Sequence, residues 1–483
     1  MRNYVFPLTG KYCALLLFIL FVAGCSLAPD YRRPGAPVPT QWTGNEHLTA
    51  PVADNLVISS ARTIDWQDFV ADGRLRKLIS LALENNRDLR QTLLNVEAAR
   101  AQYGIQRADR LPGAELQGDS MRQRVPDDLR SPGMPGLQSR YEAGIGLPAF
   151  ELDLFGRVRN LSEAALQEYL ASGEVARSAQ ISLVSEVIQA YITRGGAQQR
   201  YQLASRSLNT SEISLHLTGQ RRQQGAATEL DYQEALGQTQ QLRADVERID
   251  REFRQASNAL ALLVGVNDVR PYLPVSPGKN SLLVQVLAPG TPSELVSLRP
   301  DIRAAEHRLQ SRNASIGAAR AAFFPRISLT GALGTSSAEL SNLFESGQRT
   351  WSFAPQITLP IFDGGRNRAG LDLAEARKDI AVAAYEQTIQ TAFREVSDAL
   401  AATDTLRREE VARRGFAQST GRALLLAEER YRSGADDHLR LLDAQRRDFA
   451  SQQSLVEVET QRQVSLATLF RTLGGGWRGE SLQ

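Results

Sequence analysis

Cys25 is the residue whose surroundings most clearly predict a covalent reaction. The apolar run 14–22 ends in Val22-Ala23-Gly24-Cys25. This run is too short to span a bilayer, and a basic start followed by an apolar stretch and small residues is typical of a secretory signal. Small residues directly before a cysteine resemble a bacterial lipobox, in which the peptide is cut before the cysteine and the new terminus is acylated. We therefore predict removal of residues 1–24 and lipidation of Cys25; an ordinary signal peptide that leaves a free thiol is the alternative.

The residue after the cysteine indicates which of the two bacterial membranes holds the lipoprotein. Ser26 stands where an aspartate is typical of lipoproteins retained in the inner membrane. We therefore expect the mature chain in the outer membrane, in contact with its lipid.

The rest of the sequence offers little for catalysis or metal binding. No histidine has another histidine or a cysteine at metal-ligand spacing; the four are His47, His216, His307 and His438. The glycine runs 364–365 and 474–476 do not open a helix that carries a lysine, so neither is a phosphate-binding loop. We expect no metal, no cofactor and no enzymatic activity.

Composition and charge exclude two further classes of protein. The 483 residues are 42% hydrophobic and 23% charged, which excludes wholesale disorder. The 56 basic and 54 acidic residues give a net charge of +2 and are spread along the chain, so nothing indicates nucleic acid as a partner.

The sequence contains two similar halves. Matching positions occur in the same order in both, among them Gly104 with Gly317, Glu186-Val187 with Glu395-Val396, and Gly225 with Gly434. We interpret this as a duplicated unit rather than an array of short repeats. The predicted order is a signal peptide (1–24), an anchored segment (25–65), a first repeat (66–265), a linker (266–298), a second repeat (299–474) and a tail (475–483).

Each half predicts a long helical hairpin. Proline is absent between Pro148 and Pro271 and again after Pro360, so helices can run without interruption. Gly225 and Gly434 interrupt these stretches as residues that end one helix and let the chain turn back. We expect arms of about 40–60 residues, preceded in each half by a shorter helix at 72–108 or 301–323. A plain coiled-coil rod would share these features.

Strand patterns argue against a rod. Apolar residues alternate with small or polar ones in 351–362, 326–334 and 141–147, and 114–123 is a fourth strand by similarity between the halves. About ten residues of such alternation is typical of a transmembrane β-strand, although a sandwich strand fits each segment taken singly. Strands cross a membrane only as a closed barrel, and four are too few to close one. We therefore predict that several chains pool their strands, with three copies as the natural closure.

At this point the sequence resembles the outer membrane factor family, the TolC-like channels of bacterial efflux and type I secretion. The similarity covers nearly the whole chain and is most specific in the lipobox and in LRPDIRAAE (298–306), FFPRI (323–327), LPIFDGGR (359–366), YRSG (431–434), LLDAQ (441–445) and LGGGW (473–477). The resemblance is to the lipidated branch that serves resistance-nodulation-division (RND) pumps. It implies a homotrimer whose twelve-stranded barrel continues as a long α-helical barrel.

The resemblance also implies partners and a gate. A periplasmic adaptor and an inner-membrane RND-type pump would supply the energy for efflux; the duct of a type I protein secretion system is the alternative. Leu439 and Asp443 share one helix face and match the positions where the family narrows the periplasmic mouth. Asp443 would attract cations, unless it is only a solvated acid near a helix start. Asp231 and Asp436 are further candidates for the gate. Asp231 could pair with basic groups of a neighbouring mouth, and Asp436 with Asp437 could instead cap the helix.

Overall fold

The computed structural model describes residues 26–39, 59–60, 65–274, 282–284, 287–288, 296 and 298–475. The predicted signal peptide and Cys25 lie outside these residues. The chain divides into two compact units. One contains Asn95–Gly173 and Ala304–Glu386 together with residues up to Gly35; the other contains Ala36–Leu94, Glu174–Arg303 and residues from Gln387 onward. Each unit draws on both predicted repeats, so the compact units do not coincide with them.

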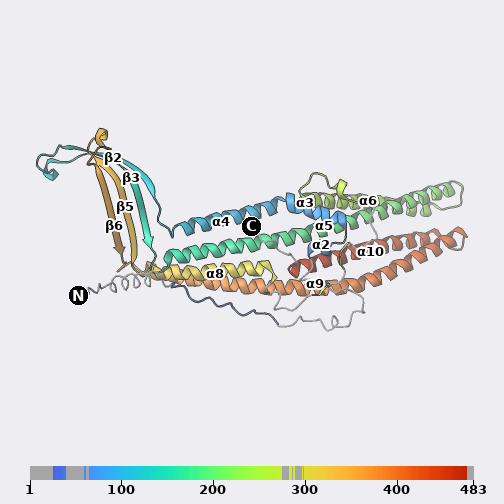
Figure 1. The fold of residues 1–483 in the computed structure, drawn as a ribbon. Coiled ribbons are helices and arrows are strands. Elements are labelled where there is room, and N and C mark those ends of the chain that lie inside the picture. The colour runs from blue at the N-terminus through green and yellow to red at the C-terminus, as the bar shows by residue number, and fades with distance from the viewer. Residues whose placement is uncertain are drawn as a thin grey trace, which may run out of the picture. The chain divides into compact units, whose positions relative to one another are not determined.

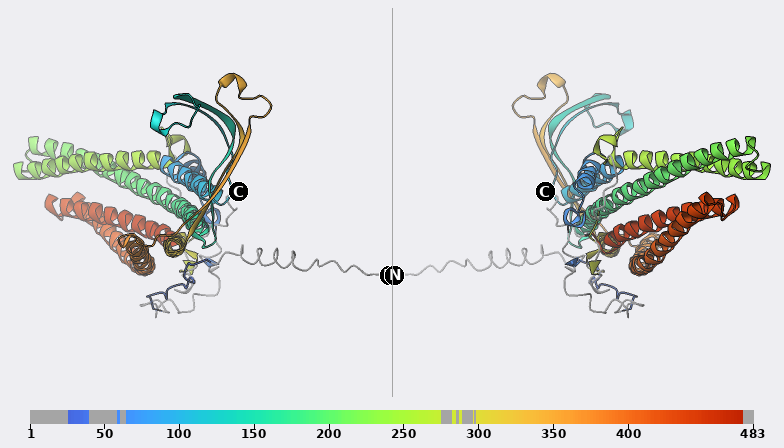
Figure 2. Two further views of the ribbon diagram at one scale, coloured as in Figure 1. Left: turned by 90° about the vertical axis from the view of Figure 1, so that its left-hand side faces the viewer. Right: turned by 90° about the vertical axis from the view of Figure 1, so that its right-hand side faces the viewer.

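The first unit contains a four-stranded sheet (Figures 1 and 2). Its strands are antiparallel in the order β2 (Glu115–Arg124), β3 (Leu137–Leu152), β5 (Arg326–Ser337) and β6 (Arg349–Thr358). All four predicted strands are present, but β3 is longer than 141–147. The strand predicted at 351–362 ends at Thr358, because Pro360 has no N–H to donate to a ladder. Single turns of 3-10 helix, η2 (Asp127–Leu129) and η4 (Leu340–Asn342), lie in the connections between strands.

The register of the sheet separates two kinds of face. Ile145 pairs with Leu116 on one side and with Leu333 on the other, and Leu333 pairs in turn with Trp351. These four large side chains form one row across the sheet and are 58–86% exposed. The next row, on the opposite face, is small or polar: Gln117, Gly144, Gly334 and Thr350. The predicted alternation therefore holds across these two rows of the sheet.

Two helical hairpins account for most of the helix content (Figures 1 and 2). In the first, α5 (Arg157–Gln223, 67 residues) is followed by α6 (Glu229–Val264, 36 residues). In the second, α9 (Arg366–Arg432, 67 residues) is followed by α10 (His438–Thr472, 35 residues). The expectation of arms of about 40–60 residues was wrong, because the arms are unequal. Nothing in the sequence stops α5 or α9 early, whereas α6 ends where Gly265 takes φ +72°.

The shorter elements are α2 (Trp66–Phe69), α3 (Gly73–Asn85), α4 (Arg87–Ala108), α8 (Pro300–Ala321), η3 (Arg270–Tyr272) and the parallel pair β1 (Ser59–Ser60) and β4 (Leu287–Ala288). The helix predicted at 72–108 is broken at Asn86. The Asn86 side chain accepts a hydrogen bond from the backbone N of Leu89 (2.9 Å) and donates one to the carbonyl of Leu263 (3.0 Å). It therefore caps α4 and ties the break to the end of α6.

The core of the second unit fixes the end of α10. Phe69 stacks on Phe470 with ring centroids 4.3 Å apart. Leu75, Leu78 and Ile79 of α3 are fully buried. Arg299 donates to the carbonyl of Thr472 (3.0 Å), which satisfies one of the orphan acceptors of the helix end.

Candidate functional site at the helical hairpin tips

Both predicted turn glycines lie directly after the long helices. Gly225 has φ +75° and Gly434 has φ +73°, a left-handed conformation that glycine adopts without strain. The amide of Gly225 donates to Arg222 (3.0 Å) and that of Ala226 donates to Arg221 (2.8 Å). The second tip repeats this pair, with Gly434 donating to Tyr431 (3.1 Å) and Ala435 to Arg430 (2.8 Å). Each long helix therefore ends in a Schellman motif that reverses the chain.

The helix that follows each turn starts at a side-chain cap. Thr228 and Asp231 form a capping box at α6: Thr228 Oγ1 accepts from the amide of Asp231 (3.1 Å), and Asp231 Oδ2 accepts from the amide of Thr228 (2.8 Å). Hydrogen bonds from Thr228 hold the pKa of Asp231 below its ordinary value. Asp437 caps α10 by accepting from the amide of Arg440 (3.0 Å). Within the described part of the chain, Asp231 has no ion-pair partner.

Asp436 is not a free acid at the tip, nor does it cap the helix. Its two carboxylate oxygens accept a fork of hydrogen bonds from Arg430, at 2.7 and 2.9 Å, and its side chain is only 9% exposed. This hydrogen bonding lowers the pKa of Asp436. The expectation that Asp436 caps the helix is therefore wrong, because Asp437 fills that position. The charge of Asp436 is matched within its own hairpin, and its place at the gate stays a prediction.

Leu439 and Asp443 lie one turn apart on α10, as their spacing predicts. Leu439 is 52% exposed. The Asp443 side chain is half exposed and pairs with Arg447 at 2.9 Å. The sequence analysis missed Arg447, although its position four residues after an acid is a recognisable helical pair. The carboxylate at the candidate constriction therefore has a cation beside it.

Two contacts join the hairpins near the tips, and the sequence analysis anticipated neither. Arg221 at the end of α5 donates from Nη1 to the phenolic oxygen of Tyr431 at the end of α9 (2.7 Å). Arg446 of α10 donates from Nε to Oε1 of Gln238 on α6 (2.5 Å). No local pattern marks these pairs, because their members are far apart in the sequence.

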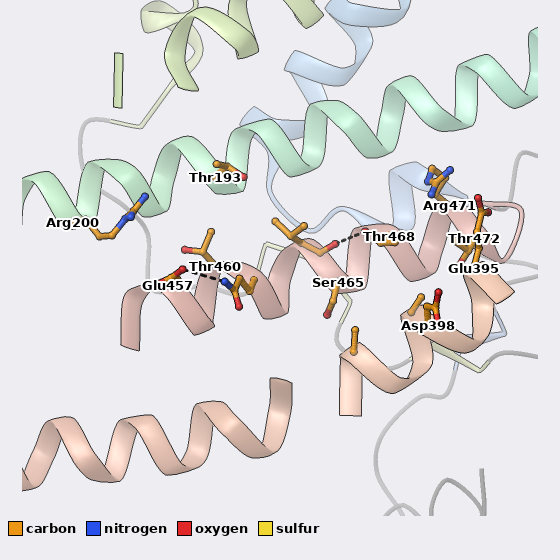
Figure 3. Close-up of a pocket in the computed structure, with 14 residues that line it drawn as sticks. Thr193, Arg200, Glu395, Asp398, Glu457, Thr460, Ser465, Thr468, Arg471 and Thr472 are labelled. Atoms are coloured by element: carbon orange, nitrogen blue, oxygen red, sulfur yellow. Dashed lines mark hydrogen bonds between the residues drawn. The ribbon is translucent and has the colours of Figure 1, made fainter. Parts of the chain in front are cut away.

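A groove between α5, α9 and α10 encloses about 580 Å³ (Figure 3). Three of the hydroxyls that line it, those of Thr460, Ser465 and Thr468, donate to backbone carbonyls of their own helix at 2.7–3.1 Å. Glu395 pairs with Arg299 at 2.9 Å. The lining contains neither histidine nor cysteine.

Residues 26–33 form a strap along α8, defined by side-chain contacts in the first unit. Ser26 donates to Asn160 Oδ1 (2.8 Å), and Asn313 donates to the carbonyl of Pro29 (2.7 Å). The Arg33 guanidinium donates two hydrogen bonds of 2.7 Å to the carboxylate of Glu306. The residue that follows Cys25 is therefore held beside the start of α5.

The strap also contains a partly buried phenol. Tyr31 donates its hydroxyl to Glu306 Oε1 at 3.1 Å. Burial, together with the Glu306 carboxylate, raises the pKa of Tyr31.

The described residues contain neither a membrane-spanning helix nor a cluster of metal ligands. None of the helices there combines the length and the apolar character needed to cross a bilayer. In the same ranges, His, Cys, Asp and Glu side chains do not gather into a group that could hold a metal ion.

Comparison with known proteins places the chain in a family. Residues 78–266 and 291–475 match the family described as outer membrane efflux protein. Outer membrane protein OprJ of Pseudomonas aeruginosa is 58% identical over 468 residues, which cover 97% of this chain and 96% of that protein. The probable efflux pump outer membrane protein SepC of Pseudomonas putida is 45% identical, with 96% of each chain covered.

A solved structure is similar over almost the same length. The crystal structure of a membrane protein from Pseudomonas aeruginosa has a TM-score of 0.88 and 58% identity. The alignment covers 95% of this chain and 99% of the other.

Proposed function

The chain belongs to the outer membrane efflux protein family, and from this premise we propose that three copies form the outer-membrane duct of a tripartite efflux system. The protein is an efflux component of the outer membrane and serves as a transport conduit. In the proposed system, a periplasmic adaptor connects the duct to an inner-membrane RND-type pump. That pump supplies the energy, and the duct itself conducts passively.

The main support for this proposal is the difference between the two faces of the sheet. Leu116, Ile145, Leu333 and Trp351 form an apolar row that the chain itself leaves exposed. Burying such a row in lipid is favourable, whereas exposing it to water is not. The opposite face, with Gln117 and Thr350, suits a water-filled lumen.

The unpaired edges of the sheet support a barrel that is built from the strands of several copies. β2 and β6 are the outer strands, and neither pairs with a further strand among the described residues. In lipid every backbone donor and acceptor needs a partner, so an open edge cannot remain there. Adding β2 of one copy to β6 of the next satisfies both edges, and three copies give about twelve strands.

The helices that follow the strands suit a tunnel. α5 begins shortly after β3, and α9 follows β6. At 1.5 Å per residue each helix is about 100 Å long, far longer than a compact domain needs. We assign the periplasmic mouth to the tips, with Leu439 and Asp443 as the constriction and Gly225 and Gly434 as the turns that build it.

Native mass spectrometry in mild detergent, combined with planar-bilayer conductance, tests the duct. We expect a mass of about three protomers and a channel only in that fraction. A stable monomer that conducts would overturn the proposal. Loss of drug export from cells that lack the gene, restored by the parent chain, tests the efflux role separately.

A further inference from the structure

His438 occupies an unusual position for a histidine. It is the first residue of α10 and is only 5% exposed. Its ring lies 5.4 Å from that of Tyr431 on α9, tilted by 44°. Neither ring nitrogen has a hydrogen-bond partner among the described residues. A buried polar group without a partner is costly, and most buried imidazoles have at least one.

Charged groups from three helices act on this ring. α6 contributes Asp231 and Glu234, α5 contributes Arg221, and the cap of α10 contributes Asp437. The acids favour an imidazolium and Arg221 opposes it, but burial outweighs them and lowers the pKa of His438 from its ordinary 6.5. The N-terminus of α10 also disfavours a cation at this position. The packed tip therefore holds a neutral ring.

We propose that His438 is a proton-binding switch of the hairpin tips: protonation loosens the start of α10 from α6 and α9 and widens the mouth. The charged ring has to leave its buried site to gain water or to meet the carboxylates of Asp231 and Glu234. Leaving separates it from Tyr431, which Arg221 ties to the first hairpin. The effect on the mouth rests on the proposed function, whereas the loosening does not.

The direction of the pH effect follows from the two conformations. The packed tip binds the proton more weakly than a loosened tip, in which the ring has an ordinary pKa near 6.5. Above that pH both conformations are neutral and the packed tip keeps its full advantage. As the pH falls below it, the loosened tip gains, until the packed form is protonated too. Each unit of difference in pKa changes the ratio of the two conformations about tenfold.

Distance measurements between the two tips test the switch directly. Ala226 and Ala435 are exposed, occupy matching positions after the turn glycines, and can carry spin labels as Ala226→Cys and Ala435→Cys. We expect the distances in the full-length protein to lengthen or broaden between about pH 8 and about pH 5. His438→Phe keeps a ring against Tyr431 but cannot titrate, so its distances should not respond. An unchanged elution volume checks its assembly.

His216 provides the matched control. It is an exposed histidine of α5 near the tip of the first hairpin, and its Nε2 lies within hydrogen-bonding distance of Gln220 (3.1 Å). His216→Phe should keep the response of the parent. If the parent distances ignore pH, or if His438→Phe responds as the parent does, the switch is wrong.

Bilayer conductance over the same pH range separates the two proposals. A conductance that rises in acid with the parent, but not with His438→Phe, supports both the switch and the assignment of the mouth. If the distances change with pH only when His438 is present, and the conductance does not change with pH, the switch is supported. The assignment of the tips as the constriction is then wrong.

Discussion

Arg221 and Tyr431 join the two hairpins of the chain. The guanidinium donates from Nη1 to the phenolic oxygen at 2.7 Å, and its carbon lies 5.5 Å from the centre of the same ring. One arginine of the first hairpin thus contacts the last turn of α9 by a hydrogen bond and a cation–π interaction. The neighbouring Arg222 instead pairs with Glu229 (2.7 Å) and lies over Tyr232, within its own hairpin.

This difference between adjacent arginines gives a first prediction. Tyr431→Phe and Arg221→Ala should both loosen the mouth and raise channel conductance. The first removes the hydrogen bond between these residues, and the second removes the cation–π interaction as well. The free energy of unfolding should change by less than about 1 kcal/mol, since the contact is exposed. Arg222→Ala is the control and should leave conductance near the parent value. Equal effects of Arg221→Ala and Arg222→Ala would show that the tie between hairpins does not restrict the pore.

A second prediction concerns charge at the constriction. Asp443→Ala should lower the preference for cations, and Leu439→Ala should widen the pore. Arg447→Ala should act in the opposite direction to Asp443→Ala and strengthen cation preference, because it leaves the carboxylate without its partner at 2.9 Å. Reversal potentials under a salt gradient measure the cation preference, and single-channel conductance measures the pore width. Asp436→Ala serves as the comparison: if it alone shifts selectivity, the constriction is misassigned.

The two faces of the sheet give a third prediction. Trp351→Lys places a charge on the apolar face, which costs up to about 2–4 kcal/mol in a barrel, depending on depth. Thr350→Lys, one residue earlier, places the same charge on the opposite face and should be tolerated. Trimer yield and urea unfolding in lipid vesicles distinguish them. Similar losses from both variants would contradict a lipid-facing row.

Matched glycines give a fourth prediction, for the strap. A Cβ on Gly317 of α8 would overlap Asn160 Nδ2 and lie 2.7 Å from the backbone N of Ala28, whereas a Cβ on Gly104 of α4 meets no atom within 4 Å. Gly317→Ala should therefore displace the strap and speed hydrogen exchange in residues 26–33. Gly104→Ala should stabilise its helix by up to about 1 kcal/mol. A protected strap in Gly317→Ala would mean that it docks elsewhere.

The fifth prediction is lipidation of Cys25. Mass spectrometry of the mature N-terminus should find an acylated cysteine directly before Ser26. Cys25→Ala should reduce the yield of assembled protein more than it prevents insertion, since the proposed barrel spans the membrane by itself. An unmodified N-terminus at another residue would exclude the lipobox interpretation.

The sequence by itself determined the elements and the family. Gly225 and Gly434 could be assigned as turns because a left-handed residue after a helix is a local requirement that glycine meets best. The strands could be found because alternation along one segment is set by the pleat of that segment. Arm lengths were less accessible, because the continuation of α5 and α9 beyond their partners depends on what packs against them.

Only the tertiary structure decided the state of individual side chains at the tips. Asp436 and Asp443 are both acids near one helix start, yet the first is buried in a fork with Arg430 and the second is half exposed beside Arg447. His438 could not be distinguished by sequence from His216, although packing against α6 and α9 buries one and leaves the other exposed. The strap on α8 was equally invisible, because Arg33 and Glu306 are far apart along the chain. Long charged side chains have many possible partners within reach, and packing of distant segments selects among them.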